Sequence, residues 1–217
     1  MQPRWYDDAC GAAHALELVG ERWALLVVRE LMFGARRFGE IREGLPGISA
    51  NVLTQRLAGL EAAGIVVRRQ LPSPANAHVY ELTPWGYESE PIFQTLGRWA
   101  ARSPSHDASL PLSAVSVLLS FRTMIDPARA KGFEATIGLR LGGDTFVARV
   151  HKSEITIRRT ALEDVDATLT GEPTALAAVV YGGRALTAAE DAGALTVEGN
   201  RALAKRFVTL FRLPAKA

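Results

Sequence analysis

Apolar residues in the first hundred positions of the chain recur with the three-to-four-residue period of an α-helix. This pattern predicts helices over residues 9–19, 22–33 and 36–44. A fourth helix is expected to begin after Ser49, a residue type that caps helix N-termini, and to end at Gly64. Its stripe of apolar side chains consists of Leu53, Leu57 and Leu60.

After this helix the pattern changes to the alternation of β-strands. Residues 65–71 and 78–83 are expected to form two strands, joined by a hairpin tip that contains proline and asparagine. A further helical stretch follows Pro84. Its apolar side carries Ile92, Phe93, Leu96 and Trp99. Helices, a helix-turn-helix and a β-hairpin in this order predict a mainly α winged helix-turn-helix fold.

A polar segment with prolines at residues 103–110 is expected to be a linker between two domains. The first domain would cover residues 1–102 and the second residues 111–217. Strands are expected at residues 135–143, 145–152, 154–160, 166–171 and 194–199, and helices at residues 173–182, 185–193 and 200–211. The second domain is therefore predicted to be α+β, with strands first and helices packed on one face.

Net charge alone does not indicate a nucleic-acid partner, because it is only +2 over 217 residues. The positive charge is local, however. Between residues 36 and 69 six arginines stand against three glutamates, and arginine suits phosphate groups and guanine edges. These arginines are Arg36, Arg37, Arg42, Arg56, Arg68 and Arg69. A basic cluster is also common on an ordinary solvated face.

The side of the fourth helix opposite its leucines carries Asn51, Thr54, Gln55 and Ala58. Asparagine and glutamine can each bond adenine N6 and N7, and threonine can offer a methyl or a hydroxyl group to a base. In a helix-turn-helix this end of the second helix enters the major groove. A solvated face is the alternative; the neighbouring cap, arginines and hairpin favour DNA recognition.

The expected DNA contacts fall into three groups. Base edges would be met from the capped end of the fourth helix, by Ser49, Asn51, Thr54 and Gln55. Phosphates would be met by Arg36, Arg37, Arg56, Arg68 and Arg69, which set the register without reading sequence. The hairpin tip would approach the minor groove or the backbone with Asn76 and His78.

Other kinds of site find little support in the residue types. One cysteine and four widely separated histidines predict no metal site and no cofactor. No phosphate loop or nucleophile–base pair indicates an enzyme. No run approaches the roughly 18 apolar residues of a membrane span, and the start of the chain lacks the apolar core of a signal peptide. A cytoplasmic chain without a membrane partner is therefore expected.

The stretch from Gly20 to Arg69, followed by "YELTPWG", resembles the HxlR-type (MarR-like) winged helix-turn-helix transcriptional regulators. The motifs "LLVVREL", "RRFGEI", "LPGIS", "LTQRL" and "LEAAGIV" carry the resemblance, which covers residues 5–102. It implies a homodimer on a pseudo-palindromic operator of double-stranded DNA, with the two recognition helices about 34 Å apart. Phe93, Leu96 and Trp99 are candidates for the dimer seam, or for ordinary core of the domain.

Cys10 stands just ahead of the first helix, where many members of that family have a cysteine that in some senses oxidants. Gly11 follows it, where the family commonly has proline, so the match is partial. A helix N-terminus lowers the pKa of a thiol, whereas the nearby Asp7 and Asp8 raise it. Redox sensing and an inert thiol are both open interpretations of Cys10.

The second domain resembles the sterol-carrier-protein fold over residues 166–213, where a Gly-Gly pair follows a helix and precedes "ALTVEG" and an amphipathic closing helix. The resemblance implies a cavity for a lipid or another apolar molecule between sheet and helices. Candidate lining residues are Phe121, Phe146, Val180, Phe207 and Phe211. The same side chains could instead fill a packed domain that serves dimerisation.

These features predict a transcriptional regulator rather than an enzyme. It would be a homodimeric repressor whose operator binding responds to an apolar small molecule or to oxidation of Cys10. The alternative is a carrier of an apolar small molecule, with the helical half serving only for assembly.

Overall fold

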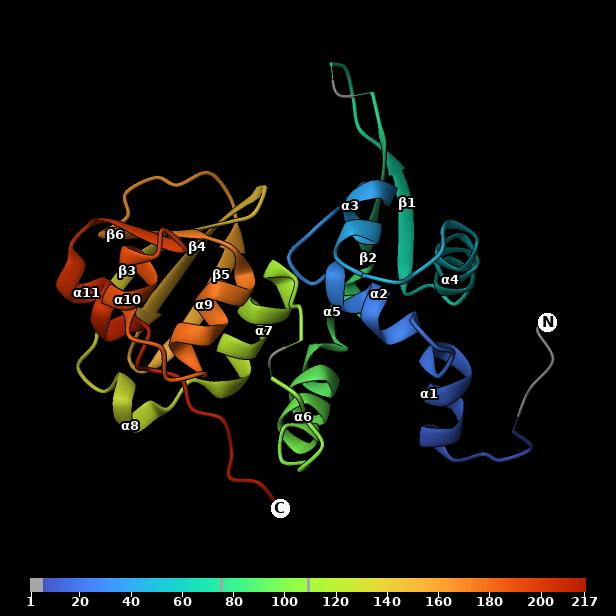
Figure 1. Ribbon diagram of the computed structural model, residues 1–217. Helices are drawn as coiled ribbons and strands as arrows, with labels where there is room; N and C mark the ends of the chain where they lie inside the picture. Colours follow the sequence, from blue (N-terminus) through green and yellow to red (C-terminus); the bar gives the residue numbers. More distant parts are fainter. Residues whose placement is uncertain (1–5, 75, 109) are drawn as a thin grey trace. The chain divides into compact units, whose positions relative to one another are not determined.

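The computed structural model describes residues 6–74, 76–108 and 110–217, and the chain divides into two compact units, Met1–Pro91 and Ile92–Ala217 (Figure 1). Helix α6 (Glu90–Ala100) begins at the end of the first unit and lies mostly in the second. The predicted first domain, by contrast, contains the whole of this helix.

The first unit contains five further helices and one hairpin. The helices are α1 (Gly11–Val19), α2 (Ala24–Glu30), α3 (Phe38–Glu43), α4 (Ala50–Ala62) and α5 (Pro84–Tyr87). α2 begins later than residue 22 because Trp23 adopts a left-handed backbone conformation, with φ of 79°. A residue in that conformation cannot continue a right-handed helix.

Strands β1 (Val66–Gln70) and β2 (His78–Leu82) form the predicted hairpin, paired antiparallel from Val66 opposite Leu82 to Gln70 opposite His78. A single β-bridge joins the backbone of Arg36 to the other side of β2. Its N–H donates to the Tyr80 carbonyl at 2.9 Å, and the Tyr80 N–H donates to the Arg36 carbonyl at 2.8 Å. The chain just ahead of α3 is thereby fixed to the hairpin.

The core of the first unit forms where the apolar stripes of its helices meet. α2 contacts α4, and α4 contacts α1 and β1. Buried side chains come from the helices, from the turn between α3 and α4, and from the hairpin; they include Val27, Val28, Leu31, Ile41, Leu45, Leu53, Leu57, Leu60, Val79 and Leu82. The predicted leucine stripe of α4 is thus the side that faces the core.

The second unit is built on a five-stranded sheet in the order β5-β4-β3-β6-β7. β3 and β6 are parallel, and the other neighbouring strands are antiparallel. The strands are β3 (Ala135–Leu141), β4 (Asp144–His151), β5 (Glu154–Arg159), β6 (Ala167–Gly171) and β7 (Leu195–Gly199). All five predicted strands are present.

Helices of this unit pack on the sheet and on one another: α7 contacts β5 and α9, and α11 contacts β6 and β7 (Figure 1). The helices are α7 (Ala114–Met124), α8 (Pro127–Ala130), α9 (Pro173–Val180), α10 (Leu186–Asp191) and α11 (Arg201–Phe207). The mixed α and β class is confirmed. The expectation that strands come first is wrong, because α7 and α8 precede the sheet.

Three phenylalanines form the centre of the second unit. The rings of Phe121 and Phe211 stack with their centroids 4.2 Å apart, and the Phe207 ring meets each of them edge-on at 5.9 and 5.3 Å. The three side chains are fully or almost fully buried. Aromatic contacts of this kind add to the stabilisation that burial of apolar area already provides.

Candidate nucleic-acid interface

Helix α4 presents a polar face because its N-terminus is capped and its apolar side is buried. The Ser49 hydroxyl oxygen accepts the Val52 N–H at 3.2 Å, which caps the first turn. Leu53, Leu57 and Leu60 are buried on the other side. The exposed face follows from this orientation, and it carries the predicted reading residues near the helix N-terminus.

Asn51 and Gln55 lie exposed on this face, and neither side chain hydrogen-bonds to any residue within the described ranges. Their amides therefore keep all donors and acceptors for an external partner. Thr54 differs, because its hydroxyl donates to the Ala50 carbonyl at 2.9 Å. That hydroxyl keeps only acceptor capacity, and the methyl group is the other part of Thr54 that a base could contact.

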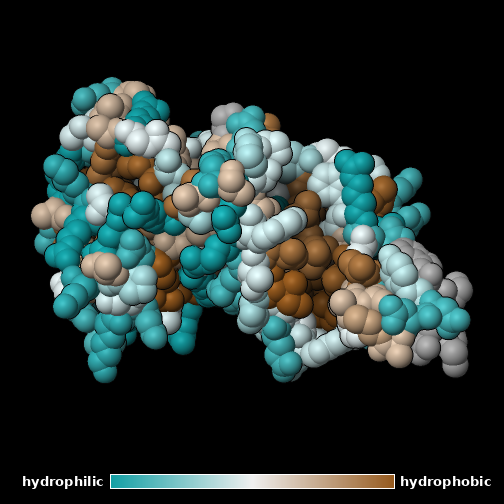
Figure 2. All heavy atoms as spheres, turned by 90° about the horizontal axis from the view of Figure 1, so that it is seen from below, coloured by the Kyte–Doolittle hydropathy of each residue, from teal (hydrophilic) through white to brown (hydrophobic). Residues whose placement is uncertain are grey.

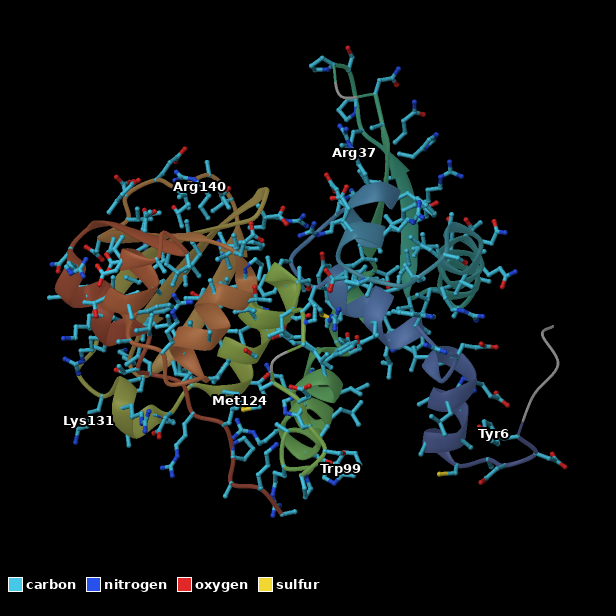
Figure 3. All side chains as sticks on the ribbon, viewed as in Figure 1. Tyr6, Arg37, Trp99, Met124, Lys131 and Arg140 are labelled. Carbon is cyan, nitrogen blue, oxygen red and sulfur yellow. The ribbon has the colours of Figure 1, made fainter. Side chains whose placement is uncertain are left out.

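The two adjacent arginines ahead of α3 have opposite environments. Arg37 is exposed, and Figure 3 shows its side chain at the end of α3 that lies beside the hairpin. Arg36 is only 6% exposed, and its backbone is paired with that of Tyr80. The expected contact between Arg36 and a phosphate finds no support in this placement, since a phosphate cannot reach a buried guanidinium.

Arg56 and Arg69 are each paired with a glutamate. The Arg56 guanidinium lies 3.0 Å from the Glu21 carboxylate, and its side chain is 21% exposed. Arg69 forms an ion pair across the hairpin with Glu81. Both pairs neutralise much of the positive charge that was predicted for this face, and neither glutamate partner is evident from the sequence.

Among the described residues of the hairpin, Arg68 is a cation without an ion pair. Arg68 is exposed, and within the described ranges its side chain has neither an ion pair nor a hydrogen bond. Nearer the tip, the Gln70 amide donates to the Asn76 side-chain oxygen at 2.9 Å, so Asn76 supports the shape of the hairpin. His78 is exposed opposite Gln70.

The predicted contact residues thus fall into two groups: those that are exposed, and arginines that are buried or paired with a carboxylate. A polar face with Ser49, Asn51, Thr54 and Gln55 is brought together on one helix, with Arg37 and Arg68 as the unpaired cations of the neighbouring elements. Arg36 is removed from the surface, and Arg56 and Arg69 are held by carboxylates. An open face of amides beside cations can bond base edges and phosphates together.

Cys10 is exposed immediately before α1. The backbone N–H groups of Ala12 and Ala13 point toward the sulfur and lower the pKa of the thiol. The Asp8 carboxylate instead accepts the Cys10 N–H at 2.9 Å. The thiol is therefore accessible and more easily ionised than an ordinary cysteine.

The candidate seam residues of α6 lie on a helix without any buried side chain. Trp99 is 73% exposed and Leu96 is 43% exposed, whereas Phe93 is half-buried. Ile92 of the same helix and Leu16 of α1 are also exposed. Figure 2 shows hydrophobic residues reaching the surface on one face of the molecule.

Three of the candidate pocket residues of the second unit pack against one another, and the other two are buried or half-buried. Phe121, Phe207 and Phe211 form the ring cluster, Phe146 is fully buried, and Val180 is half-buried. Beside this cluster the Tyr181 hydroxyl lies 2.8 Å from the Ser120 hydroxyl, and burial raises the pKa of Tyr181. The phenylalanines fill the interior with their own rings.

Comparison with known proteins identifies both parts of the chain. Residues 18–107 match the HxlR-like helix-turn-helix family, and residues 101–217 match the alkyl sulfatase C-terminal family. The uncharacterized HTH-type transcriptional regulator YvaP of Bacillus subtilis (strain 168) is 37% identical over 86 residues, which are 40% of this chain and 80% of YvaP. The chain belongs to the HxlR-like helix-turn-helix family, with a domain of the alkyl sulfatase C-terminal family.

A second relative of this HxlR-like chain is the HTH-type transcriptional regulator YodB of Bacillus subtilis (strain 168), which is 41% identical over 86 residues, 40% of this chain and 77% of YodB. The solved structure of reduced YodB is 36% identical and has a TM-score of 0.41; it covers 46% of this chain and all of that chain.

The family assignment confirms the prediction of a winged helix-turn-helix of the class that regulates transcription. The sterol-carrier resemblance of the second part stays a prediction. Among the described residues no helix is long and apolar enough to cross a membrane.

Proposed function

We propose that this chain is a homodimeric repressor that binds a pseudo-palindromic operator through α4 and the β1–β2 hairpin. The open face of α4 carries this proposal, because Asn51 and Gln55 are exposed and make no hydrogen bond to a described residue. A capped helix whose leucines are locked in the core holds these amides in a fixed orientation, as sequence reading requires.

Arg37 and Arg68 would hold the phosphates on either side of the bases that α4 reads. Both are exposed: Arg68 lies in β1, which pairs with β2, and Arg37 follows Arg36, whose backbone hydrogen-bonds to Tyr80 of β2. Arg56 and Arg69 would contribute less, because Glu21 and Glu81 already neutralise them. We do not assign a phosphate to Arg36.

A second copy of the chain would cover the apolar side of α6. Trp99, Leu96 and Ile92 lie on that helix and are exposed, and burial of such side chains favours association. The relatives named as transcriptional regulators support a DNA-binding role, and a two-fold dimer matches the two half-sites of a pseudo-palindrome.

Operator binding would respond to a small molecule held by the second unit, or to oxidation of Cys10. The accessible thiol with a lowered pKa supports the second route. A second unit that holds such a small molecule would have a regulatory rather than a catalytic role. The carrier alternative gains no support from the phenylalanine cluster, because its rings pack on one another.

Footprinting of the region upstream of the chain's own gene tests the proposal. We expect protection of two half-sites one helical turn apart, and a binding constant that falls steeply with salt. Absence of salt-dependent binding to this DNA would overturn the repressor proposal. Analytical ultracentrifugation of W99D tests the seam: the variant should be monomeric at concentrations where the wild type is a dimer.

A further inference from the structure

The second unit contains a cavity that is separate from its phenylalanine cluster. Its volume is about 300 Å³, and it is widely open to solvent. Arg98 of α6, residues 124–127 between α7 and α8, and residues 212–215 of the C-terminal tail line it. Met124, which ends α7, is labelled in Figure 3. This volume is at the lower end of the range for small-molecule sites.

The tail that forms one wall is attached to the rest of the unit on both sides of the cavity. At the first residue of the wall, the Arg212 N–H donates to the Met124 carbonyl at 3.0 Å. After the wall, the Lys216 ammonium donates to the carbonyls of Ala101 and Ser103 at 3.2 and 2.9 Å. The wall is therefore supported by hydrogen bonds rather than lying loose on the surface.

The cavity carries positive charge that the protein does not neutralise. Within the described residues, the Arg212 side chain has neither a hydrogen bond nor an ion pair. The Arg98 guanidinium donates to the Thr123 carbonyl, an uncharged acceptor, and keeps its charge. Two guanidinium groups thus line one small cavity, where an anion would bind both.

The one carboxylate in the lining is already used. Asp126 caps α8, since one of its oxygens accepts the Ala128 N–H at 2.9 Å, and its other oxygen lies 3.7 Å from the Arg129 guanidinium. Its negative charge is therefore balanced from outside the cavity. The lining also includes Met124, Ile125 and Leu213, which offer apolar side chains.

We propose that this cavity binds a small amphiphilic organic anion. Arg212 and Arg98 would hold a carboxylate or sulfate head group, because the planar guanidinium fork matches such oxygens in pairs. Met124 and Leu213 would contact a short apolar body. This ligand differs from the apolar molecule predicted from the sequence, because its recognition depends on charge and because it avoids the phenylalanine cluster.

The inference deepens the proposed function by naming the chemical class of the effector, and only its regulatory part rests on that function. Arg98 belongs to α6, the helix proposed as the dimer seam. A ligand that joins Arg98 to the tail would favour one position of α6 over others, and so would shift the operator affinity of the dimer.

Isothermal titration calorimetry on the full chain tests the binding step. The probes are hexanoate and hexyl sulfate, which separate the two head groups, with hexyltrimethylammonium and 1-hexanol as cationic and neutral controls. At least one anion should bind, and both controls should bind at least about tenfold more weakly. R212Q should weaken anion binding at least about tenfold, and R98Q should weaken it by a similar factor.

The control K205Q removes one positive charge from an exposed site on α11, outside the cavity, and should change the dissociation constant less than about twofold. A215W keeps every charge and fills the cavity, so it should abolish binding even if R212Q folds poorly. Equal binding of hexanol and the anions, or equal losses in K205Q and R212Q, would overturn the proposal.

Fluorescence anisotropy with the footprinted operator then separates the two levels. Saturating anion should change operator affinity about fivefold or more in the wild type and not in A215W. If the anion binds but operator affinity stays unchanged, the cavity assignment stands and the regulatory role of this ligand is overturned. If no operator is found, the calorimetry still decides whether the cavity binds anions.

Discussion

Within the described residues, each unit has arginines without a carboxylate partner, and their surroundings differ. In the first, Arg37 and Arg68 lie on open surface next to a polar helix face. In the second, Arg98 and Arg212 line a small open cavity together with Met124, Ile125 and Leu213. Open surface can contact an extended polyanion such as the DNA backbone, whereas a cavity selects a small anion by size as well as by charge.

The difference also concerns how each set of groups is assembled. The exposed polar face of α4 is formed within one helix, because the Ser49 cap and the buried leucine stripe fix the orientation of that helix. The cavity brings together α6, the end of α7 and the C-terminal tail, which are far apart along the chain. Four substitutions or labelling experiments test whether the units behave as differently as this comparison implies.

The largest effect is expected in the interior of the second unit. F121A removes the ring that stacks on Phe211 and should lower the free energy of unfolding by about 3–5 kcal/mol, because a cavity is left behind. Urea denaturation followed by circular dichroism measures this. L112A, which truncates an exposed apolar side chain of the same unit, should cost less than about 0.5 kcal/mol. Equal effects would contradict a packed interior.

The next effect concerns base reading by α4. Q55A should weaken binding to the operator by about 1–3 kcal/mol and leave binding to unrelated DNA unchanged, because the amide is free to bond a base. T54V is the matched control: the Thr54 hydroxyl already donates within the helix, so its replacement should cost much less. Fluorescence anisotropy with both DNAs measures the loss, and a uniform loss on both would argue against base reading.

A smaller effect should distinguish free from paired arginines. R37A and R68A should each weaken binding to all DNA and reduce the slope of log K against log salt by about 0.9. R69A should reduce the slope less, since Glu81 already neutralises that guanidinium. Titrations at four salt concentrations give the slopes. If R69A and R68A had equal slopes, the ion pair across the hairpin would not control phosphate binding.

The smallest expected effect is the titration of Cys10. Because the pKa of this thiol is lowered by backbone N–H groups, its alkylation by iodoacetamide should reach half its maximal rate at a lower pH than in an unfolded peptide, where cysteine titrates near about 8.5. Mass spectrometry against pH measures the rate, and urea-unfolded protein is the control. Identical midpoints would remove the helix N-terminus as an activating feature.

Local patterns in the sequence predicted much of the first unit. Ser49 and the leucines of α4 were placed correctly because a cap and a helical stripe depend on neighbours within one or two turns. The sequence could not show that Arg36 is buried, because burial depends on segments that are distant along the chain, such as the strand of Tyr80 with which its backbone pairs. The ion pairs of Arg56 with Glu21 and of Arg69 with Glu81 were missed because each joins residues that are not neighbours in the sequence.

In the second unit the fold class was predicted, but the first helix was missed. α7 is buried at most positions around its circumference, from Ala114 to Met124, so its apolar residues show no helical stripe. Periodicity cannot identify a helix whose sides are nearly all apolar. The cavity gave no local signal either, since Arg98 and Arg212 are unremarkable until the fold brings them together.

The β-bridge at Arg36 fixes the distance between the backbones at Arg36 and Arg68 in the first unit. Tyr80 pairs with Arg36 on one side and with Arg68 on the other, so two strand spacings, roughly 10 Å, separate the backbones at Arg36 and Arg68. Arg37 follows Arg36 directly and so starts from this fixed frame. Sequence changes at the hairpin tip would alter the length of the hairpin. The distance between the backbones at Arg36 and Arg68 would stay constant, and with it the spacing of the phosphate contacts proposed for Arg37 and Arg68.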